Sequence, residues 1–271
     1  MVKNMQNEVK NFKLDRISPS MVSSYLMCPL SFYYGYVAKI RLPHGVIHLE
    51  FGSAVHKAIE EMYKGSKNPI AAFEARFKKE KLADNEKHMY KEYVELGKEM
   101  LANYFEEHPM LDKLYGLAAG KSEKYIRRYL THPITGRQSS IPLSGVLDRL
   151  TDNGKIIEYK TSKTKWNVEE TRFKVQNLLY NLWYYSEYNR IAEETLYFIL
   201  LKKHKTHKRD QVLQTISSHV THDDLAAAFE EVELIIEKIN SGIFDRPRGP
   251  GVYHPDYCDC YKYEKALATN D

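Results

Sequence analysis

The sequence predicts an α/β or α+β protein in which helices come first and a β-sheet follows, interrupted by one helix. Up to about residue 110, apolar residues recur every three or four positions, which indicates helices. From about residue 121, short runs rich in Val, Ile, Leu and Tyr lie between turn residues, which is typical of strands. No repeat, low-complexity tract or interdomain linker interrupts the 271 residues, so we expect a single domain.

The N-terminal helical region should extend over about residues 18–110. It opens with "SPS", in which Ser18 or Ser20 can cap a helix and Pro19 suits the first turn. A later amphipathic stretch ends at Gly65, a typical helix stop. The expected helices are several short ones over residues 18–37, followed by residues 52–65, 68–80 and 84–107.

The sheet-containing core should cover about residues 121–220, and a closing helix and tail should occupy about residues 221–271. The candidate strands consist largely of residues that favour extended backbone. The expected strands are residues 124–130, 141–150, 155–161, 195–203 and 211–220, and the expected helices are residues 168–189 and 222–240.

Composition and charge limit the class of protein. No stretch approaches the roughly 18 consecutive apolar residues of a membrane helix, and the N-terminus lacks the apolar core of a signal peptide. Three cysteines do not make a disulfide framework in a chain of this length, so we expect a reducing, cytoplasmic setting. The net charge of +4 permits a polyanionic partner but does not require one.

The most informative stretch is SGVLDRLTDNGKIIEYKT, residues 144–161, which places acids and a lysine in strands otherwise suited to a core. Residues 152–154 suit a three-residue hairpin loop with Gly154 in the left-handed conformation. Thr151 would then pair with Lys155, and this pairing fixes the register of the two strands.

In that register Asp148 lies directly opposite Glu158, with β-carbons about 4.5–5.5 Å apart, and Lys160 lies on the same face. Two carboxylates this close repel each other unless a cation lies between them, and oxygen ligands at about 2.1 Å suit Mg²⁺ or Mn²⁺. The pattern therefore indicates a metal site. The alternative is a surface hairpin whose acids and lysine form a solvated network of ion pairs.

The series Asp148, then Glu158-Tyr159-Lys160, resembles the D…(D/E)xK signature of the PD-(D/E)xK nuclease superfamily. Three further stretches are similar to motifs of its RecB-like branch, in the same order along the chain. They are the opening SPSMVSSYLMCPLSFYYGYV (18–37), FGSAVHKAIE (51–60) with its Gly-x-x-x-His, and QNLLY (176–180) with its Gln-x-x-x-Tyr. The resemblance implies a single RecB-like nuclease domain, related to the CRISPR-adaptation and phage RecB-like exonucleases. Its fold would be α/β, with a restriction-endonuclease-like core of a mixed β-sheet flanked by helices and an N-terminal helical region.

The resemblance also implies a role for each residue of the site. Asp148, Glu158 and the backbone carbonyl of Tyr159 would hold Mg²⁺ or Mn²⁺, which polarises the scissile phosphate and lowers the pKa of a bound water. Lys160 would orient that water or help to deprotonate it, and would offset charge in the transition state. His56 would be a further ligand of the same or a second ion. For His56 the alternative is an ordinary interfacial histidine.

Other residues are candidates for contact with the substrate or the metal. Gln176 and Tyr180 lie four residues apart, hence on one helix face, where the family contacts substrate or steadies the site. Their alternative is packing within an aromatic-rich core helix. Glu123 stands near the start of the first strand, where the family often carries an acid. It would lie close to the metal or be a solvated charge.

The run KKHKTHKRD (202–210) joins the last two expected strands. Lys203, Lys205 and Lys208 within it are candidates for contacts with DNA phosphates, which would make binding salt-dependent. The alternative is a solvated, charged loop.

The activity implied by the resemblance is that of a metal-dependent DNA exonuclease, which hydrolyses phosphodiester bonds at DNA ends or single strands in recombination, repair or processing. The alternatives are a DNA endonuclease or flap nuclease with the same active site, and a non-catalytic DNA-binding module. The sequence contains no Gly-x-x-x-x-Gly-Lys-Ser/Thr phosphate loop, so any helicase or recombination protein would have to act in trans.

Many RecB-like nucleases carry a [4Fe–4S] cluster held by one cysteine before the nuclease core and three after it. Cys28 stands at the first of these positions, and Cys258 and Cys260 stand in the tail. Three thiolates are too few for the usual cage, and His254 is the candidate for a fourth ligand to iron or zinc. We therefore expect no iron–sulfur cluster and regard the three cysteines as a remnant of one.

Overall fold

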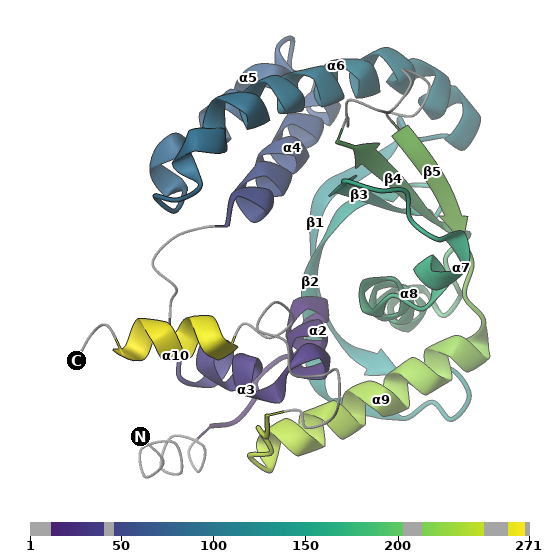
Figure 1. Ribbon diagram of the computed structural model, residues 1–271. Helices are drawn as coiled ribbons and strands as arrows, with labels where there is room; N and C mark the ends of the chain where they lie inside the picture. Colours follow the sequence, from purple (N-terminus) through teal and green to yellow (C-terminus); the bar gives the residue numbers. More distant parts are fainter. Residues whose placement is uncertain (1–11, 41–45, 203–212, 247–259, 269–271) are drawn as a thin grey trace.

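The structure is a computed structural model that describes residues 12–40, 46–202, 213–246 and 260–268. In this part of the chain helices come first and strands follow, as predicted (Figure 1). The helices are α2 (Pro19–Met27), α3 (Pro29–Phe32), the π-helical turn η1 (Tyr33–Val37), α4 (Ile47–Tyr63), α5 (Pro69–Arg76), the 3₁₀ turns η2 (Lys79–Lys81) and η3 (Lys87–Met89), α6 (Tyr90–Tyr115), α7 (Val168–Arg172), α8 (Val175–Tyr188), α9 (His222–Asn240) and α10 (Cys260–Ala268). The strands are β1 (Gly120–Thr131), β2 (Gln138–Thr151), β3 (Ile156–Ser162), β4 (Thr195–Leu201) and β5 (Leu213–Ser218).

The five strands form one sheet in the order β1-β2-β3-β4-β5. Neighbouring strands are antiparallel, except that β3 and β4 run parallel. Helices α7 and α8 supply the crossover that a parallel pair requires. The prediction of a mixed sheet flanked by helices, with a helical N-terminal region, is confirmed.

Two apolar clusters pack against this sheet. The first joins α2, α3, α8, α9 and α10 to β1 and β2, and the second joins α4, α5 and α6 to β3 and β4. Figure 1 shows β1 and β2 curving around α8, with α4 and α6 on the outer side. Strand β3 contributes to both clusters, through Ile156 to the first and Ile157 to the second. The middle of the sheet is therefore held from both sides.

Several helix boundaries differ from the prediction. Helix α4 begins at Ile47 rather than residue 52, because Ile47 and Phe51 are buried and extend its apolar face toward the N-terminus. Helix α5 ends at Arg76, and α6 runs from Tyr90 to Tyr115, past its internal proline. The helix predicted over residues 168–189 is two helices, α7 and α8, separated by two residues that close α7. The closing helix occupies residues 222–240, as predicted.

Strand boundaries differ less. Strands β1 and β2 are longer than predicted because their polar ends also pair with each other, as in Gly120 with Thr151. Strand β4 ends at Leu201, and β5 begins at Leu213. None of the helices in the described ranges is long and apolar enough to cross a membrane.

The β2–β3 hairpin has the predicted loop and register. Gly154 has φ of +90°, and its N–H donates to the Thr151 carbonyl at 3.0 Å. The N–H of Thr151 donates to the Lys155 carbonyl, also at 3.0 Å. The ladder pairs are Arg149 with Ile157 and Leu150 with Ile156, which is the register that brings Asp148 toward Glu158.

Candidate metal and catalytic site

The site lies where β2 and β3 separate beyond their ladder pairs. At this point the backbone N–H of Tyr159 donates to Oδ2 of Asp148 at 2.8 Å, so a side chain rather than a carbonyl bridges the two strands. This bond fixes one oxygen of the carboxylate and leaves the other to turn toward α4. Asp148 is half-buried, whereas Glu158 on the facing strand is completely buried.

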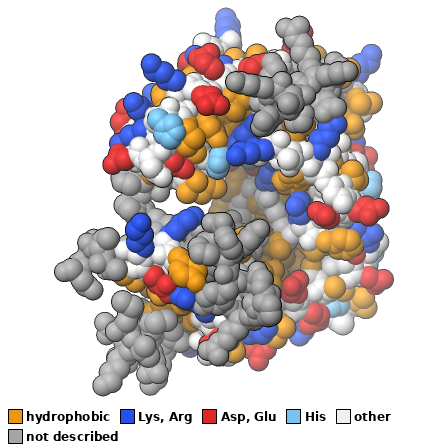
Figure 2. All heavy atoms as spheres, viewed as in Figure 1, with side chains coloured by type: hydrophobic (Ala, Val, Ile, Leu, Met, Phe, Trp, Pro, Cys, Tyr) orange, Lys and Arg blue, Asp and Glu red, His pale blue; other side chains and the backbone are white. Residues whose placement is uncertain are grey.

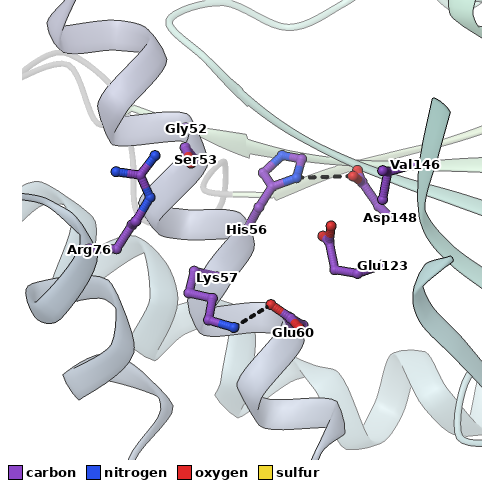
Figure 3. A pocket seen from close by; sticks show the side chains of 9 residues that line it. All are labelled: Gly52, Ser53, His56, Lys57, Glu60, Arg76, Glu123, Val146 and Asp148. Carbon is purple, nitrogen blue, oxygen red and sulfur yellow. Dashed lines mark hydrogen bonds and ion pairs between the residues drawn. The ribbon is translucent and has the colours of Figure 1, made fainter. Parts of the chain in front are cut away.

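His56 reaches the acids from α4. Its Nδ1 lies 3.1 Å from Oδ1 of Asp148, the oxygen that Tyr159 does not use. The neighbouring positions Val55 and Ile59 are buried and hold α4 against the second apolar cluster, which places His56 at the rim of that contact. Figure 3 shows the imidazole directed from α4 toward Asp148.

Glu123 completes a cluster of three candidate ligands. Each of His56, Glu123 and Asp148 offers a ligand atom, and these atoms lie within 4.8 Å of one another. Ser122 pairs with Arg149, and Lys124 pairs with Leu147, so Glu123 stands opposite Asp148 in the β1–β2 register. Its φ of +47° is rare for a residue other than glycine and costs on the order of 1–3 kcal/mol. Figure 3 shows the Glu123 carboxylate turned toward the other two ligands.

Glu158 and Lys160 form an ion pair beside these ligands. Lys160 Nζ donates to Oε2 of Glu158 at 2.9 Å, which confirms that the two side chains share a face of β3. The other oxygen, Oε1, is buried and has no hydrogen-bond partner among the described residues. An unpaired buried carboxylate oxygen is costly, and a divalent cation is a physical way to satisfy it. The residues present therefore fit a hard metal ion.

The charges of the site are strongly coupled. Burial, followed by the Asp148 charge, raises the pKa of Glu158 to about 8. Burial would also raise the pKa of Asp148, but His56, Lys160 and the Tyr159 N–H outweigh it and lower that pKa. Without a metal, Glu158 is therefore the carboxyl of this pair that holds a proton, and Asp148 is ionised.

The surrounding cations and acids respond to the same charges. Burial would lower the pKa of His56, but Asp148 raises it by a larger amount. Partial removal from water, and then the Asp148 charge, raise the pKa of Glu123. Burial would lower the pKa of Lys160, but Glu158 and Asp148 together raise it, so the lysine stays cationic.

The side chain of Tyr159 points away from the acids into the second apolar cluster. Its phenol oxygen lies 2.9 Å from the Tyr63 hydroxyl and accepts a hydrogen bond from Tyr104 at 3.2 Å. His108 Nε2 lies 3.0 Å from the Tyr63 hydroxyl and extends this network. The buried phenols tie β3 to α4 and α6, and so fix the backbone between Glu158 and Lys160.

Arg149 is a contributor that sequence reasoning missed. It is only 2% exposed, and its guanidinium donates to the carbonyls of Leu117 and Ala118 and to Oγ of Ser122. These bonds hold the backbone just before Glu123, where the chain enters its left-handed conformation. A charged residue directly after Asp148 in an otherwise apolar strand was the available signal.

Gln176 and Tyr180 both lie on α8, and the structure distinguishes them. Tyr180 is buried, and its hydroxyl donates to the Val146 carbonyl at 2.8 Å, so it supports β2 from behind the site. Burial, and then the charge of Glu158, raise the pKa of this phenol. Gln176 is half-buried. The packing alternative therefore describes Tyr180, and substrate contact by Gln176 stays a prediction.

The remaining candidates are only partly within the described residues. Lys203, Lys205, Lys208, His254 and Cys258 lie outside them. The other two cysteines are buried in the first apolar cluster.

Cys28 has a clear structural role. Its Sγ accepts a hydrogen bond from the Ser31 N–H at 3.4 Å, as the N-cap of α3, and Pro29 occupies the first turn. This capping gives the Cys-Pro pair a structural role at the start of α3. Helix α10, which begins at Cys260, packs near α3.

Comparisons with known proteins identify the family of this chain. The sequence pattern of the PD-(D/E)XK nuclease superfamily matches residues 16–262, which is most of the chain. The chain belongs to this superfamily, and it is therefore assigned to the nucleases, a class of hydrolases that generally use divalent metal ions. No curated protein matches the sequence.

The solved structures that are similar to this chain include the following two. One is described as a "Putative exonuclease" from Eubacterium rectale; it is 12% identical, with a TM-score of 0.52, and the match covers 86% of this chain and 84% of that one. The other, described as SSO0001, is 14% identical with a TM-score of 0.35, over 86% of this chain and 83% of that one. The first of these likenesses supports the fold.

Proposed function

We propose that this protein is a metal-dependent DNA exonuclease of the RecB-like branch, acting at DNA ends or single strands. The observation that carries the proposal is Glu158, a fully buried acid with one unpaired oxygen beside Asp148. Such a pair is hard to explain as a solvated surface network. The order of the motifs from residue 18 to residue 180 supports the RecB-like branch, and the described activity of the Eubacterium rectale protein favours an exonuclease.

Asp148, Glu158 and the backbone carbonyl of Tyr159 would hold Mg²⁺ or Mn²⁺, with His56 and Glu123 on the same or a second ion. The ion, when bound, supplies polarisation of the scissile phosphate and a lower pKa for the attacking water. The protein supplies orientation, because the Tyr159 N–H and His56 fix both oxygens of Asp148.

Lys160 would act by charge and position. Its raised pKa keeps the ammonium protonated, so it is suited to orient the water and to offset charge on the phosphorane-like transition state. It is poorly suited to remove a proton. The ion pair with Glu158 holds the ammonium at the site.

We further propose that the protein acts in the cytoplasm in DNA repair, recombination or processing, with any helicase or recombination protein supplied in trans. The absence of a phosphate-loop motif from the sequence supports a separate motor. The cap that Cys28 provides to α3 supports the proposal that the cysteines hold no iron–sulfur cluster.

The deciding experiment compares end-labelled linear DNA with covalently closed circles in Mg²⁺, Mn²⁺ or EDTA. We expect metal-dependent loss of linear DNA and survival of the circles. Glu158→Gln and Lys160→Met should each lower turnover by at least about 100-fold, since each removes a charge used in the transition state. Glu231→Gln, which changes an exposed acid on α9, is the matched control.

Other outcomes would change the assignment. Efficient cutting of closed circles would make the protein an endonuclease, and no cutting in either metal would favour a DNA-binding module. If Glu158→Gln or Lys160→Met kept near-normal turnover, the β2–β3 hairpin would not be the active site.

A further inference from the structure

A second, larger hollow adjoins the metal-ligand pocket. It has a volume of about 980 Å³ and is bounded by residues 12–18, η1 and the strands β1 and β2. Val146 of β2 lines both this groove and the pocket that contains His56, Glu123 and Asp148. Figure 2 shows the surface hollowed between the upper helices α4 and α5 and the lower helices α2 and α3.

Most of the charged residues that line the groove are basic. Lys13, Arg16 and Lys39 line it and are exposed, and Asp15 is the acid among its lining residues. Lys39 has φ of +53° and lies two residues after the π-helical turn η1. Like Glu123 in the adjoining pocket, it is a non-glycine residue held in an uncommon conformation, and such residues and π-turns concentrate at functional sites. The positive charge of Lys13, Arg16 and Lys39 complements a phosphate backbone.

Aromatic rings lie among these charges. Tyr125 of β1 is 62% exposed although it stands within a strand of the sheet. Tyr36 of η1 also lines the groove and is stacked on Phe32, with 4.9 Å between the ring centroids. An exposed tyrosine in a basic groove suits stacking with a nucleobase. A base can stack on such a ring only when it is unpaired, so the lining favours a single strand over a duplex.

The two strands lead directly from one hollow to the other. Glu123 and Tyr125 are two residues apart on β1, and Asp148 and Val146 are two residues apart on β2. Tyr125 pairs with Val146 across the two strands. Two residues of extended strand span about 7 Å. A base stacked on Tyr125 would therefore belong to a nucleotide adjoining the scissile phosphate.

We propose that this groove binds single-stranded DNA and feeds it to the metal-ligand pocket, with Tyr125 as a stacking platform and Lys13, Arg16 and Lys39 as phosphate contacts. The inference rests on the proposed nuclease function, because it takes the substrate to be DNA. It adds the strandedness of the substrate and the path that the strand takes.

The test is a binding measurement that does not depend on cleavage. The full chain carrying Glu158→Gln is titrated in EDTA against a short fluorescent oligo-dT and against a blunt duplex of equal length, with anisotropy as the readout. We expect tighter binding of the single strand. Adding Tyr125→Ala should weaken it roughly 5- to 150-fold, and Tyr125→Phe should keep most of the affinity because it keeps the ring.

Matched controls separate the groove from general surface effects. Tyr129→Ala removes a tyrosine of β1 that is 52% exposed and lies outside the groove lining, and it should leave affinity unchanged. Joint replacement of Lys13, Arg16 and Lys39 by Ala should reduce the slope of log affinity against log salt by about 0.7 for each DNA phosphate that the protein no longer neutralises. Replacement of exposed lysines elsewhere should not; suitable positions are Lys67, Lys91 and Lys238.

The outcomes distinguish this inference from the proposed function. Equal losses of single-strand affinity in Tyr125→Ala and Tyr129→Ala would refute the proposal that the groove binds DNA, and so would tighter binding of the duplex. Neither result would bear on the proposed nuclease function. The protein could also bind the strand through Tyr125 and yet cut no DNA in any metal. That result would support the proposed single-strand groove and refute the nuclease proposal.

Discussion

Glu158 and His56 both bind protons more tightly in the metal-free folded protein than in the unfolded chain. The pKa of Glu158 is raised to about 8 by burial and by Asp148, and the pKa of His56 is also raised, by Asp148. Between about pH 4.5 and pH 8 the folded protein therefore holds protons that the unfolded chain releases. The contribution of these two groups to stability falls as pH rises through this window, because the unfolded state gains by deprotonation. Burial lowers the pKa of His48 and of His108, which act in the opposite sense below about pH 6.5.

We expect urea unfolding in EDTA to show a free energy of unfolding that declines from pH 5 to pH 8. Glu158→Gln should show a shallower decline, since Gln does not titrate. Saturating Mn²⁺ should oppose the decline in the wild-type protein, because metal and protons compete for the same ligands. A wild-type profile that is flat in EDTA, or parallel to that of Glu158→Gln, would contradict the assignment of the proton to Glu158.

The left-handed backbone conformation of Glu123 lowers the stability of the fold, while its side chain is a candidate metal ligand. Glu123→Gly relieves a conformation that costs a residue with a side chain on the order of 1–3 kcal/mol, so the metal-free protein should become more stable by about that amount. Mn²⁺ affinity should fall at least about tenfold, because a ligand is removed. Urea unfolding in EDTA and calorimetric Mn²⁺ titration measure the two effects.

Glu123→Gln is the control for strain, since it removes the charge but keeps a side chain at φ of +47°. It should lose metal affinity as Glu123→Gly does, without the same gain in stability. If Glu123→Gly instead lowered the free energy of unfolding, the positive φ of Glu123 would not be a strained conformation. The surrounding structure, including the Arg149 bonds to Ser122 and its neighbours, would then stabilise the glutamate there.

The acids and lysine of the hairpin could be predicted because short-range rules place them. A three-residue loop ending in Gly154 fixes the register, and the register places Asp148 by Glu158 and Lys160. The position of Glu123 could only be suggested, because its side chain reaches the ligands through a backbone angle that no sequence pattern predicts. Arg149 makes its contacts with the chain just before β1, and those contacts exist only after long-range folding.

The β2–β3 hairpin depends on its loop glycine for two separate reasons. Gly154 has φ of +90°, and a β-carbon built on it would lie 2.5 Å from the hydroxyl of Tyr184, a buried residue. Gly154→Ala should therefore destabilise the protein by about 1 kcal/mol for the backbone and about 1–3 kcal/mol more for the overpacking. Thermal or urea unfolding measures the loss.

Gly136 provides a matched control in the β1–β2 connection. Its φ is +72°, but nothing lies within 4 Å of a β-carbon built there, so Gly136→Ala should cost only the backbone part, about 1 kcal/mol. Equal losses for the two variants would mean that Tyr184 yields without cost. The hairpin would then tolerate a side chain at its loop.

The types of the main helices and of the five strands were predictable, whereas several ends, the π-helical turn η1 and helix α10 were not. The amphipathic stretch of α4 is visible from residue 52, but its start depends on Ile47 and Phe51 being buried by α5 and α6. The break between α7 and α8 is not marked by glycine or proline. Asn177 of α8 instead donates to the carbonyls of Thr171 and Arg172, which closes α7. Such tertiary bonds override local propensity.

The sheet forms the centre of the molecule, with one apolar cluster on each side. Because β3 supplies side chains to both clusters, the helical N-terminal part and the sheet-containing part share a buried strand. This sharing is consistent with the expected single domain, which stays a prediction. The mixed sheet order and membership of the PD-(D/E)XK nuclease superfamily were both anticipated by the hairpin and the motifs around it.

The candidate ligands are spread widely along the chain, and this spacing has a consequence during protein synthesis. His56 leaves the ribosome well before Glu123, and Asp148 and Glu158 follow later still. A nascent chain that has made only its helices holds one ligand and no sheet to meet it. The nascent chain therefore cannot complete the candidate metal site until Glu158 has left the ribosome and β1, β2 and β3 have paired.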